Sequence, residues 1–383
     1  MKTKTEIIIC GDLCPTADTQ VLFDQADVKS LFNDVLPVLQ KADFVMGNLE
    51  FVLTDDAKPI RKSGPVLYGK TSYIDVFKKA GFDLLSLANN HIKDCGEAGV
   101  KTTLATCESA GIAAFGAASN LQDAKKPYIK DINGWKIGFM TFAEQEFNVA
   151  SNEEYGASYL DPYDDFDVLQ ELKKKVDYVV VIYHGGIEYY EYPSPLLQKK
   201  CQKFIDKGAD LVTCQHSHCI GTIEDYKQKK IIYGQGNTLF GYRENNDSWN
   251  QGLLIRLLFV NEHAAPEISF VSIQAVQSGI ELTKDMEAQK RLDTVATKSQ
   301  NLTNKTFLEQ SWSTFCLNKT AFYFAYLLGF NRLFIHLNRF SKNKLVSIFY
   351  PKKYIRTSQN IVRCEAHNEV LHTILNHHLK KQK

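Results

Sequence analysis

The chain has 383 residues, of which 44% are apolar and 23% charged, so its composition excludes a wholly disordered protein. The formal net charge is only +1, but residues 301–383 carry 13 Lys and Arg against 3 Asp and Glu. The first 300 residues are therefore acidic, and the C-terminal part is basic enough to suggest an anionic partner.

Strand and helix patterns alternate along the first two thirds of the chain. Short apolar runs predict buried strands, and apolar residues at helical spacing predict the helices between them. The predicted strands are 7–10, 43–46, 82–87, 112–115, 179–184, 209–214 and 231–233, and the predicted helices are 28–40, 73–80, 97–110, 166–176 and 195–207. Asn133-Gly134 predicts a hairpin between 128–132 and 135–142, and alternation predicts two further strands at 252–260 and 267–274. This order favours an α/β sandwich over a plain doubly wound sheet.

A polar, charge-rich stretch at 279–304 suggests a boundary, with a body over residues 1–280 and a basic, mostly helical extension over 281–383. The segment 321–340 is aromatic and apolar with Arg332 and Arg339, as in helices that lie on an anionic membrane surface. The alternative is a helical subdomain that packs on the body. No nucleic-acid-binding motif accompanies the basic charge, so we expect no nucleic-acid partner.

Cysteine usage and the absence of targeting signals predict the compartment. Nine cysteines without paired spacing fit a reducing environment, and no signal-peptide core or membrane-spanning apolar run is present. We expect a cytoplasmic protein, peripheral at the inner membrane face if the extension binds lipid.

Polar side chains follow the ends of several predicted strands. Functional residues of α/β sheets lie just past the carboxyl ends of their strands. His216 and His218 are two residues apart, so in an extended segment they would share one side. Imidazole, carboxylate and amide groups are ligands for Zn, Mn or Fe, and the set is large enough for two ions, which suits phosphate-ester hydrolysis. The set is Asp12, Asn48, Glu50, Asn90, His91, His184, His216 and His218.

These residues stand in motifs with a defined order. They are Gly11-Asp12, Asn48-Leu49-Glu50, Ala88-Asn89-Asn90-His91-x-x-Asp94-x-Gly96, His184-x-Gly186-x-Glu188-Tyr189, Gly208 to Val212 followed by His216-x-His218, and Tyr233 to Phe240. Over residues 7–260 the chain resembles the CapA family of capsule and poly-γ-glutamate synthesis proteins, in the calcineurin-like metallophosphatase superfamily. The resemblance implies a four-layer α/β/β/α sandwich of the metallophosphoesterase type, with the helical C-terminal extension outside it.

The resemblance also implies roles for individual residues. Asp12 and His218 would hold one of two divalent ions (Mn, Zn or Fe), and Glu50 would bridge to the second. Asn90, His184 and His216 would hold that second ion. His91 would assist the leaving group, with Asp94 orienting its ring.

Further residues are candidates for the substrate pocket: Asn48, Arg61, Lys62, Gly186, Glu188 and Asn237. For Arg61 and Lys62 the alternative is a solvated loop. Cys14 stands where the wider superfamily has histidine, and it is either an extra ligand or a buried apolar residue.

Two functions remain open at this point. The first is a dinuclear-metal, phosphoesterase-like hydrolase that acts on an anionic small molecule or polymer during capsule, exopolysaccharide or poly-γ-glutamate synthesis. The second is a non-catalytic, metal-binding accessory protein of a polymer synthase or export complex, which makes polymer-synthesis enzymes its partners.

Overall fold

The computed structural model describes residues 2–260, 265–327, 332–342, 344–349, 351–364, 366–371 and 374–375. The chain divides into two compact units, Met1–Leu308 and Glu309–Lys383. The sequence suggests a boundary at 280, but helix α9 (Asp285–Ser299) belongs to the first unit. The reason is its buried Arg291, whose guanidinium donates hydrogen bonds to the Ile273 carbonyl and to the Ser272 and Thr283 hydroxyls, each at 2.8 Å.

The first sheet has eight strands and is mixed. Its order is β18 (Gly279–Leu282), β17 (Glu267–Val276), β16 (Gln251–Phe259), β1 (Thr5–Leu13), β2 (Phe44–Leu49), β5 (Leu84–Ser86) and β6 (Ala113–Phe115), and β15 (Asn237–Leu239) also pairs with β1. Strands β1, β2, β5 and β6 run parallel, whereas β16, β17 and β18 form an antiparallel flank.

The second sheet has six strands. Its order is β13 (Ile223–Tyr226), β14 (Lys229–Ile232), β12 (Leu211–Gln215), β11 (Tyr178–His184), β9 (Trp135–Ala143) and β8 (Tyr128–Ile132). The four inner strands are parallel, and an antiparallel strand closes each end. The predicted β8–β9 hairpin is confirmed, and its turn residues Asn133 (φ 52°) and Gly134 (φ 87°) both have the positive φ that a tight hairpin turn requires.

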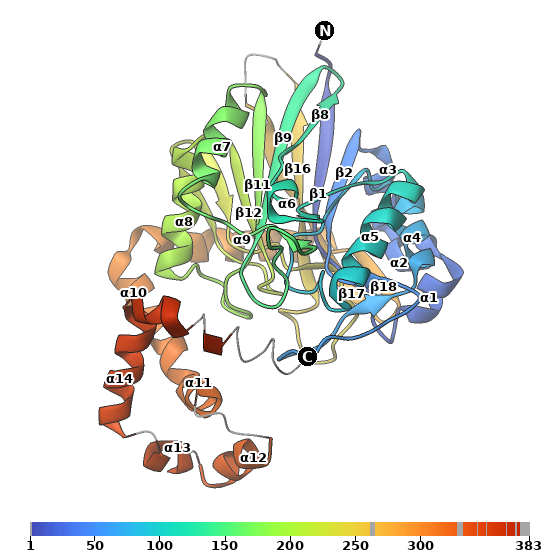
Figure 1. Ribbon diagram of the computed structural model, residues 1–383. Helices are drawn as coiled ribbons and strands as arrows, with labels where there is room; N and C mark the ends of the chain where they lie inside the picture. The colour runs from blue at the N-terminus through green and yellow to red at the C-terminus, as the bar shows by residue number, and fades with distance from the viewer. Residues whose placement is uncertain are drawn as a thin grey trace. The chain divides into compact units, whose positions relative to one another are not determined.

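The two sheets pack face to face and helices cover their outer faces (Figure 1). The core between the sheets includes Ile7, Ile9, Phe44, Phe139, Val180, Ile182 and Leu257. Helices α4 (Ile74–Ala80) and α5 (Gly96–Ala110) cover the first sheet, and α7 (Asp165–Lys173) and α8 (Pro195–Asp206) cover the second. The predicted four-layer sandwich is confirmed, and burial of the parallel strands on both faces explains their unbroken apolar runs.

The helix predicted over 28–40 is broken. It consists of α2 (Val28–Phe32), a 3₁₀ turn (Asn33–Val35) and α3 (Leu36–Lys41). Asn33 adopts φ 42°, and its side-chain amide donates a 3.0 Å hydrogen bond to the carbonyl of Ile280 in β18. A contact across 247 residues therefore interrupts a locally helical pattern.

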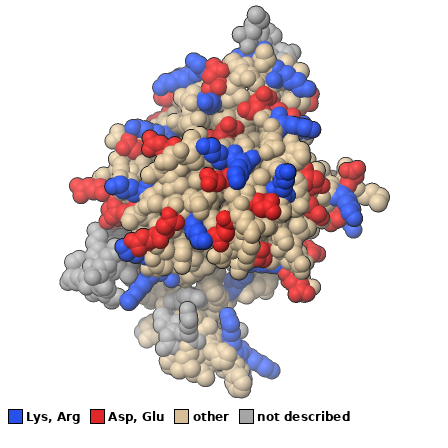
Figure 2. All heavy atoms as spheres, turned by 90° about the vertical axis from the view of Figure 1, so that its right-hand side faces the viewer, with Lys and Arg blue, Asp and Glu red and all other residues tan. Residues whose placement is uncertain are grey.

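Short elements complete the first unit: α1 (Gln20–Gln25), β3 (Val52–Leu53), β4 (Tyr68–Gly69), a 3₁₀ turn (Thr71–Tyr73), β7 (Ala117–Ala118), α6 (Leu121–Ala124), β10 (Gly156–Ala157) and a 3₁₀ turn (Gln300–Thr303). On the face seen in Figure 2, Lys and Arg are interspersed with Asp and Glu, without a large region of one sign.

Helices make up the C-terminal part. They are α10 (Lys305–Asn318), α11 (Thr320–Leu327), α12 (Arg332–Phe340), α13 (Lys344–Phe349) and α14 (Lys352–Arg363). The amphipathic segment predicted over 321–340 thus forms α11 and α12, and its residues 328–331 lie outside the described residues. Within the described ranges, no helix combines the length and apolar character needed to span a membrane.

Candidate metal centre

The sequence-predicted ligands meet at the carboxyl ends of the parallel strands of both sheets. Asp12 is the last residue but one of β1, Glu50 follows β2, Asn90 and His91 follow β5, His184 ends β11, and His216 and His218 follow β12. All seven side chains are buried. Because strands from both sheets end here, residues up to about 200 positions apart share one site.

Two groups of donor atoms have the spacing needed to hold metal ions. In the first, one ligand atom each from Glu50, His184 and His216 lies within 4.8 Å of the others. In the second, Asp12, Glu50 and His218 meet the same limit. Glu50 belongs to both groups, which is the arrangement that its predicted bridging role requires.

Amide groups complete the first group and orient its histidine. Asn90 Oδ1 lies 3.0 Å and Glu50 Oε1 3.5 Å from His184 Nε2. Asn48 Nδ2 donates to Asp12 Oδ1 at 2.7 Å and lies 3.1 Å from His184 Nδ1. His184 thus presents Nδ1 to Asn48, and Nε2 to Asn90 and Glu50.

The donor set fits divalent cations. Both oxygens of Glu50 and Nδ1 of His216 are buried without a hydrogen-bond partner among the described residues. Burial raises the pKa of Glu50 to about 8 and that of Asp12 to about 7, and it lowers the pKa of His218 to about 3. Burial also lowers the pKa of His184 and, further, of His216. Neutral imidazoles are the ligand state that metal binding uses. Glu50 and Asp12 would release their protons on binding a cation, which would also satisfy the unpaired atoms.

The His216–His218 segment is bent, so its predicted extended conformation is wrong. His216 has φ 86° and His218 has φ 50°, both in the left-handed region. Because of this bend, the two rings lie in different donor groups. His216 lies with Glu50 and His184, and His218 lies with Asp12 and Glu50. The His216 backbone N–H also donates to Asp12 Oδ2 at 3.1 Å, which ties the bend to β1.

Asn237 fixes the ring of His218. Its Nδ2 donates to the Trp249 carbonyl at 2.9 Å, so its Oδ1 accepts from His218 Nδ1, also at 2.9 Å. That hydrogen bond leaves Nε2 of His218 as the nitrogen that could bind a cation. Such outer contacts commonly set the tautomer of a metal-binding histidine.

His91 stands beside the metal groups and belongs to neither. Its Nδ1 lies 2.7 Å from Asp94 Oδ2, and its Nε2 lies 4.0 Å from Glu50 Oε1. Asp94 also pairs with Lys62 Nζ at 2.5 Å and accepts from the Leu67 backbone N–H at 2.7 Å. The ring of His91 is therefore oriented by Asp94, with its Nε2 on the side of the site.

The alternative of a solvated loop is wrong for Lys62. Only 1% of its side chain is exposed, and its ammonium group also donates to the Asn90 carbonyl at 3.2 Å. Arg61, by contrast, is exposed. Lys62 thus connects the loop after β3 to the segment that contains Asn90, His91 and Asp94.

The remaining candidates lie around the centre. Cys14 is buried, its thiol contacts the Pro15 carbonyl, and it lies outside both donor groups. Gly186 has φ 108° in the loop after His184. Glu188 is exposed, and its charge contributes to the raised pKa of Glu50.

Two supporting asparagines were not identified as such from the sequence. Asn89 donates to Asn48 Oδ1 at 3.1 Å and to the Leu49 carbonyl at 2.8 Å, and Asn148 donates to the Asn89 carbonyl at 2.9 Å. Asn89 follows a strand as the predicted ligands do, so its position in the sequence could have indicated a role at the site. Asn148 lies in an irregular loop, and no pattern in the sequence indicates its role.

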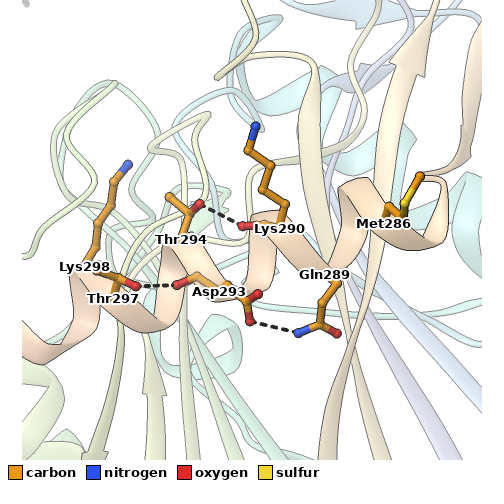
Figure 3. A pocket seen from close by; sticks show the side chains of 7 residues that line it. All are labelled: Met286, Gln289, Lys290, Asp293, Thr294, Thr297 and Lys298. Atoms are coloured by element: carbon orange, nitrogen blue, oxygen red, sulfur yellow. Dashed lines mark hydrogen bonds between the residues drawn. The ribbon is translucent and has the colours of Figure 1, made fainter.

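Helix α9 carries a separate hollow of about 600 Å³ on its exposed side (Figure 3). Its lining residues are Met286, Gln289, Lys290, Asp293, Thr294, Thr297 and Lys298. All of them come from one helix and several bond to one another along it, so the hollow offers no convergent donor set.

Comparison with known proteins identifies the family. Residues 6–242 match the model of the family described as bacterial capsule synthesis protein PGA_cap. The chain belongs to this family. The resemblance to CapA proteins is thereby confirmed, and the match covers all the predicted metal ligands from Asp12 to His218.

Named relatives support the same assignment. The capsule biosynthesis protein CapA of Bacillus anthracis is 30% identical over 260 residues, which are 64% of this chain and 62% of that protein. The PGA biosynthesis protein CapA of Bacillus subtilis is 30% identical over 246 residues, 62% of this chain and 64% of that protein. The chain thus spans less than two thirds of the length of either relative.

A similar solved structure is a 5'-nucleotidase from Candida albicans. It has 11% sequence identity and a TM-score of 0.43, and the alignment covers 79% of this chain and 59% of that one.

Proposed function

We propose that this PGA_cap family chain is a metal-dependent, phosphoesterase-like hydrolase that binds two divalent ions, Mn, Zn or Fe. One observation carries the proposal: Glu50 is buried with both oxygens unpaired, between two sets of histidine and carboxylate donors. A buried carboxyl group without partners is costly in a purely structural role, whereas a bridging ligand needs both oxygens free.

Asp12, Glu50, Asn90, His184, His216 and His218 would hold the ions. Such ions supply charge stabilisation and lower the pKa of a bound water. His91 would protonate the leaving group through Nε2, because Asp94 holds Nδ1 at 2.7 Å and thereby sets the orientation of the ring. Asn48, Gly186 and Glu188, near the donors, would line the substrate pocket, and Asn237 supports it through His218.

The family and the names of the relatives support a role in capsule or poly-γ-glutamate synthesis. The substrate would then be an anionic small molecule or polymer intermediate. In the accessory alternative, the same metal site would serve recognition within a synthase or export complex.

The test is turnover by the full-length chain loaded with Mn or Zn, on p-nitrophenyl phosphate, its bis-ester and γ-glutamyl peptides. Bound metal should accompany turnover, and a chelator should remove both. Replacing His216 with alanine should abolish them together, because it removes a donor from one group. Bound metal without turnover on any of these compounds would refute the hydrolase and favour the accessory role.

We further propose that the C-terminal helices bind an anionic membrane surface, at the cytoplasmic face if the chain resides there. On α12, Leu333, Leu337 and Phe340 follow helical spacing and are 64%, 44% and 88% exposed. Arg339 flanks this stripe on the same helix, and Asn338 is buried, where its Oδ1 accepts a hydrogen bond from the Val346 backbone N–H at 3.1 Å. An exposed apolar stripe next to basic residues is the pattern of interfacial helices.

Liposome sedimentation tests this proposal. The full chain should sediment with vesicles that contain phosphatidylglycerol and much less with phosphatidylcholine alone, and salt should weaken the binding. The double variant Leu337→Asp, Phe340→Asp should lose it. The matched control Met286→Asp changes an equally exposed apolar residue on α9 and should bind as the unmodified chain does. Equal binding by the double variant, or no binding to anionic vesicles, would exclude this surface.

A further inference from the structure

Arg243 lies in the segment between β15 and β16, outside the sequence motifs. Its guanidinium carbon is 3.1 Å from the centre of the Trp249 ring, and its Nη1 donates to the Tyr189 hydroxyl at 3.1 Å. Asn250 accepts from its backbone N–H at 2.9 Å and donates to its carbonyl at 2.7 Å. Although Arg243 is exposed, both its backbone and its head group are held in place.

The residues that contact Arg243 also contact residues of the candidate metal centre. The Trp249 ring centre is 4.7 Å from that of His218, and the Trp249 carbonyl anchors Asn237, which orients His218. The Tyr189 backbone N–H donates to the Ser217 carbonyl at 2.8 Å, between the two ligand histidines. A single indole ring therefore links the guanidinium to the Asp12–His218 donor group.

The charge of Arg243 has no protein partner in the described residues, because none of the ion pairs within 4.0 Å there involves it. A guanidinium has five N–H donors in a planar fork, and Tyr189 takes one. Stacking on an indole covers one face of the fork and leaves its edge available. That edge suits an oxyanion bound by two parallel hydrogen bonds.

We propose that Arg243 binds an oxyanion of the substrate, a carboxylate or a second phosphate, distinct from the group held by the metal ions. The inference rests on the proposed function and adds a substrate class to it: esters with a second negative group. It also gives a reason for the Trp249 and Tyr189 contacts, which preorganise an exposed arginine that would otherwise lose conformational entropy on binding.

Three matched compounds test the inference: phenyl phosphate, 4-carboxyphenyl phosphate and 1,4-phenylene bisphosphate. Binding to the Mn-loaded full chain is measured first, by titration calorimetry, so that the result does not depend on turnover. The Arg243→Gln variant should bind the carboxylate or bisphosphate compound about tenfold or more weakly, because a charged hydrogen-bond partner is lost. Its affinity for phenyl phosphate should not change.

Controls separate the outcomes. Arg356→Gln removes another exposed arginine, on α14, and should leave all three affinities unchanged. Arg243→Lys should restore only part of the affinity, since lysine lacks the planar fork. The compound whose affinity falls identifies the carboxylate or the phosphate as the bound group. If Arg243→Gln binds all three compounds as the unmodified chain does, the inference is wrong; if binding changes as expected but no ester is hydrolysed, the hydrolase proposal alone fails.

Discussion

Replacing Glu50 with glutamine is expected to abolish metal-dependent stabilisation and, without metal at pH 8, to make the protein more stable than the unmodified chain. Burial raises the pKa of Glu50 from 4.5 to about 8. The contribution of this group to stability is therefore fully present below pH 4.5 and is lost as the pH rises to about 8. By pH 8 the loss amounts to roughly 4 kcal/mol as an upper estimate, since each pKa unit corresponds to about 1.4 kcal/mol. Glutamine cannot ionise and avoids this loss.

Thermal unfolding of chelated and Mn-loaded protein between pH 5 and pH 8 provides the measurement. Metal should raise the melting temperature of the unmodified chain most at pH 8, because binding competes with protons on Glu50 and Asp12. The buried histidines, whose pKa values are lowered, cost stability as the pH falls below 6.5, but they do so equally in both proteins. The comparison at each pH therefore isolates Glu50.

Glu171→Gln is the matched control, because its carboxylate is 59% exposed and lies on α7 away from the donors. This variant should keep the full metal response and the pH dependence of the unmodified chain. A Glu50→Gln protein that is still stabilised by metal, or that is less stable than the unmodified chain at pH 8 without metal, would show that Glu50 is not a metal-bridging ligand held ready by burial.

Replacing His91 with alanine is expected to lower turnover by about 10²- to 10⁴-fold, the usual contribution of a general acid, while the bound metal is retained. The reason is its position: His91 Nε2 faces the site, but the ring belongs to neither donor group. Turnover of p-nitrophenyl phosphate and metal content by mass spectrometry should be measured on the same preparation.

Two variants sharpen this result. Asp94→Asn should reduce turnover less than His91→Ala, because it leaves the imidazole present but less well oriented. His336→Ala, which changes an exposed histidine of α12, should have no effect. Loss of metal from the His91→Ala protein would make His91 a ligand, and unchanged turnover would remove it from the chemistry.

The ligand residues could be predicted from the sequence because they follow a general rule. Apolar runs identify buried parallel strands, and parallel strands place their carboxyl ends together, so Asp12, Glu50 and His184 could be assigned to one site before any contact was known. Only the local geometry was missed at His216 and His218, where positive φ values replace the expected extended segment.

The contacts of the supporting residues could not be predicted in this way, although Lys62 itself was a candidate for the substrate pocket. Lys62, Asn148 and Arg243 come from irregular loops, and their roles depend on contacts with residues distant in the sequence. The break at Asn33 is a similar case, since the Ile280 carbonyl that fixes it lies in β18. Periodicity describes which face of an element is buried, but it carries no information on which loop reaches which strand end.

We expect donors from five separate segments to share one pair of cations. Anomalous diffraction from crystals equilibrated with Mn²⁺ tests this claim directly. We expect two peaks that both contact Glu50, one also contacting His184 and His216 and the other Asp12 and His218. Ordered crystals with no peak beside Glu50, or with manganese bound only elsewhere, would contradict it.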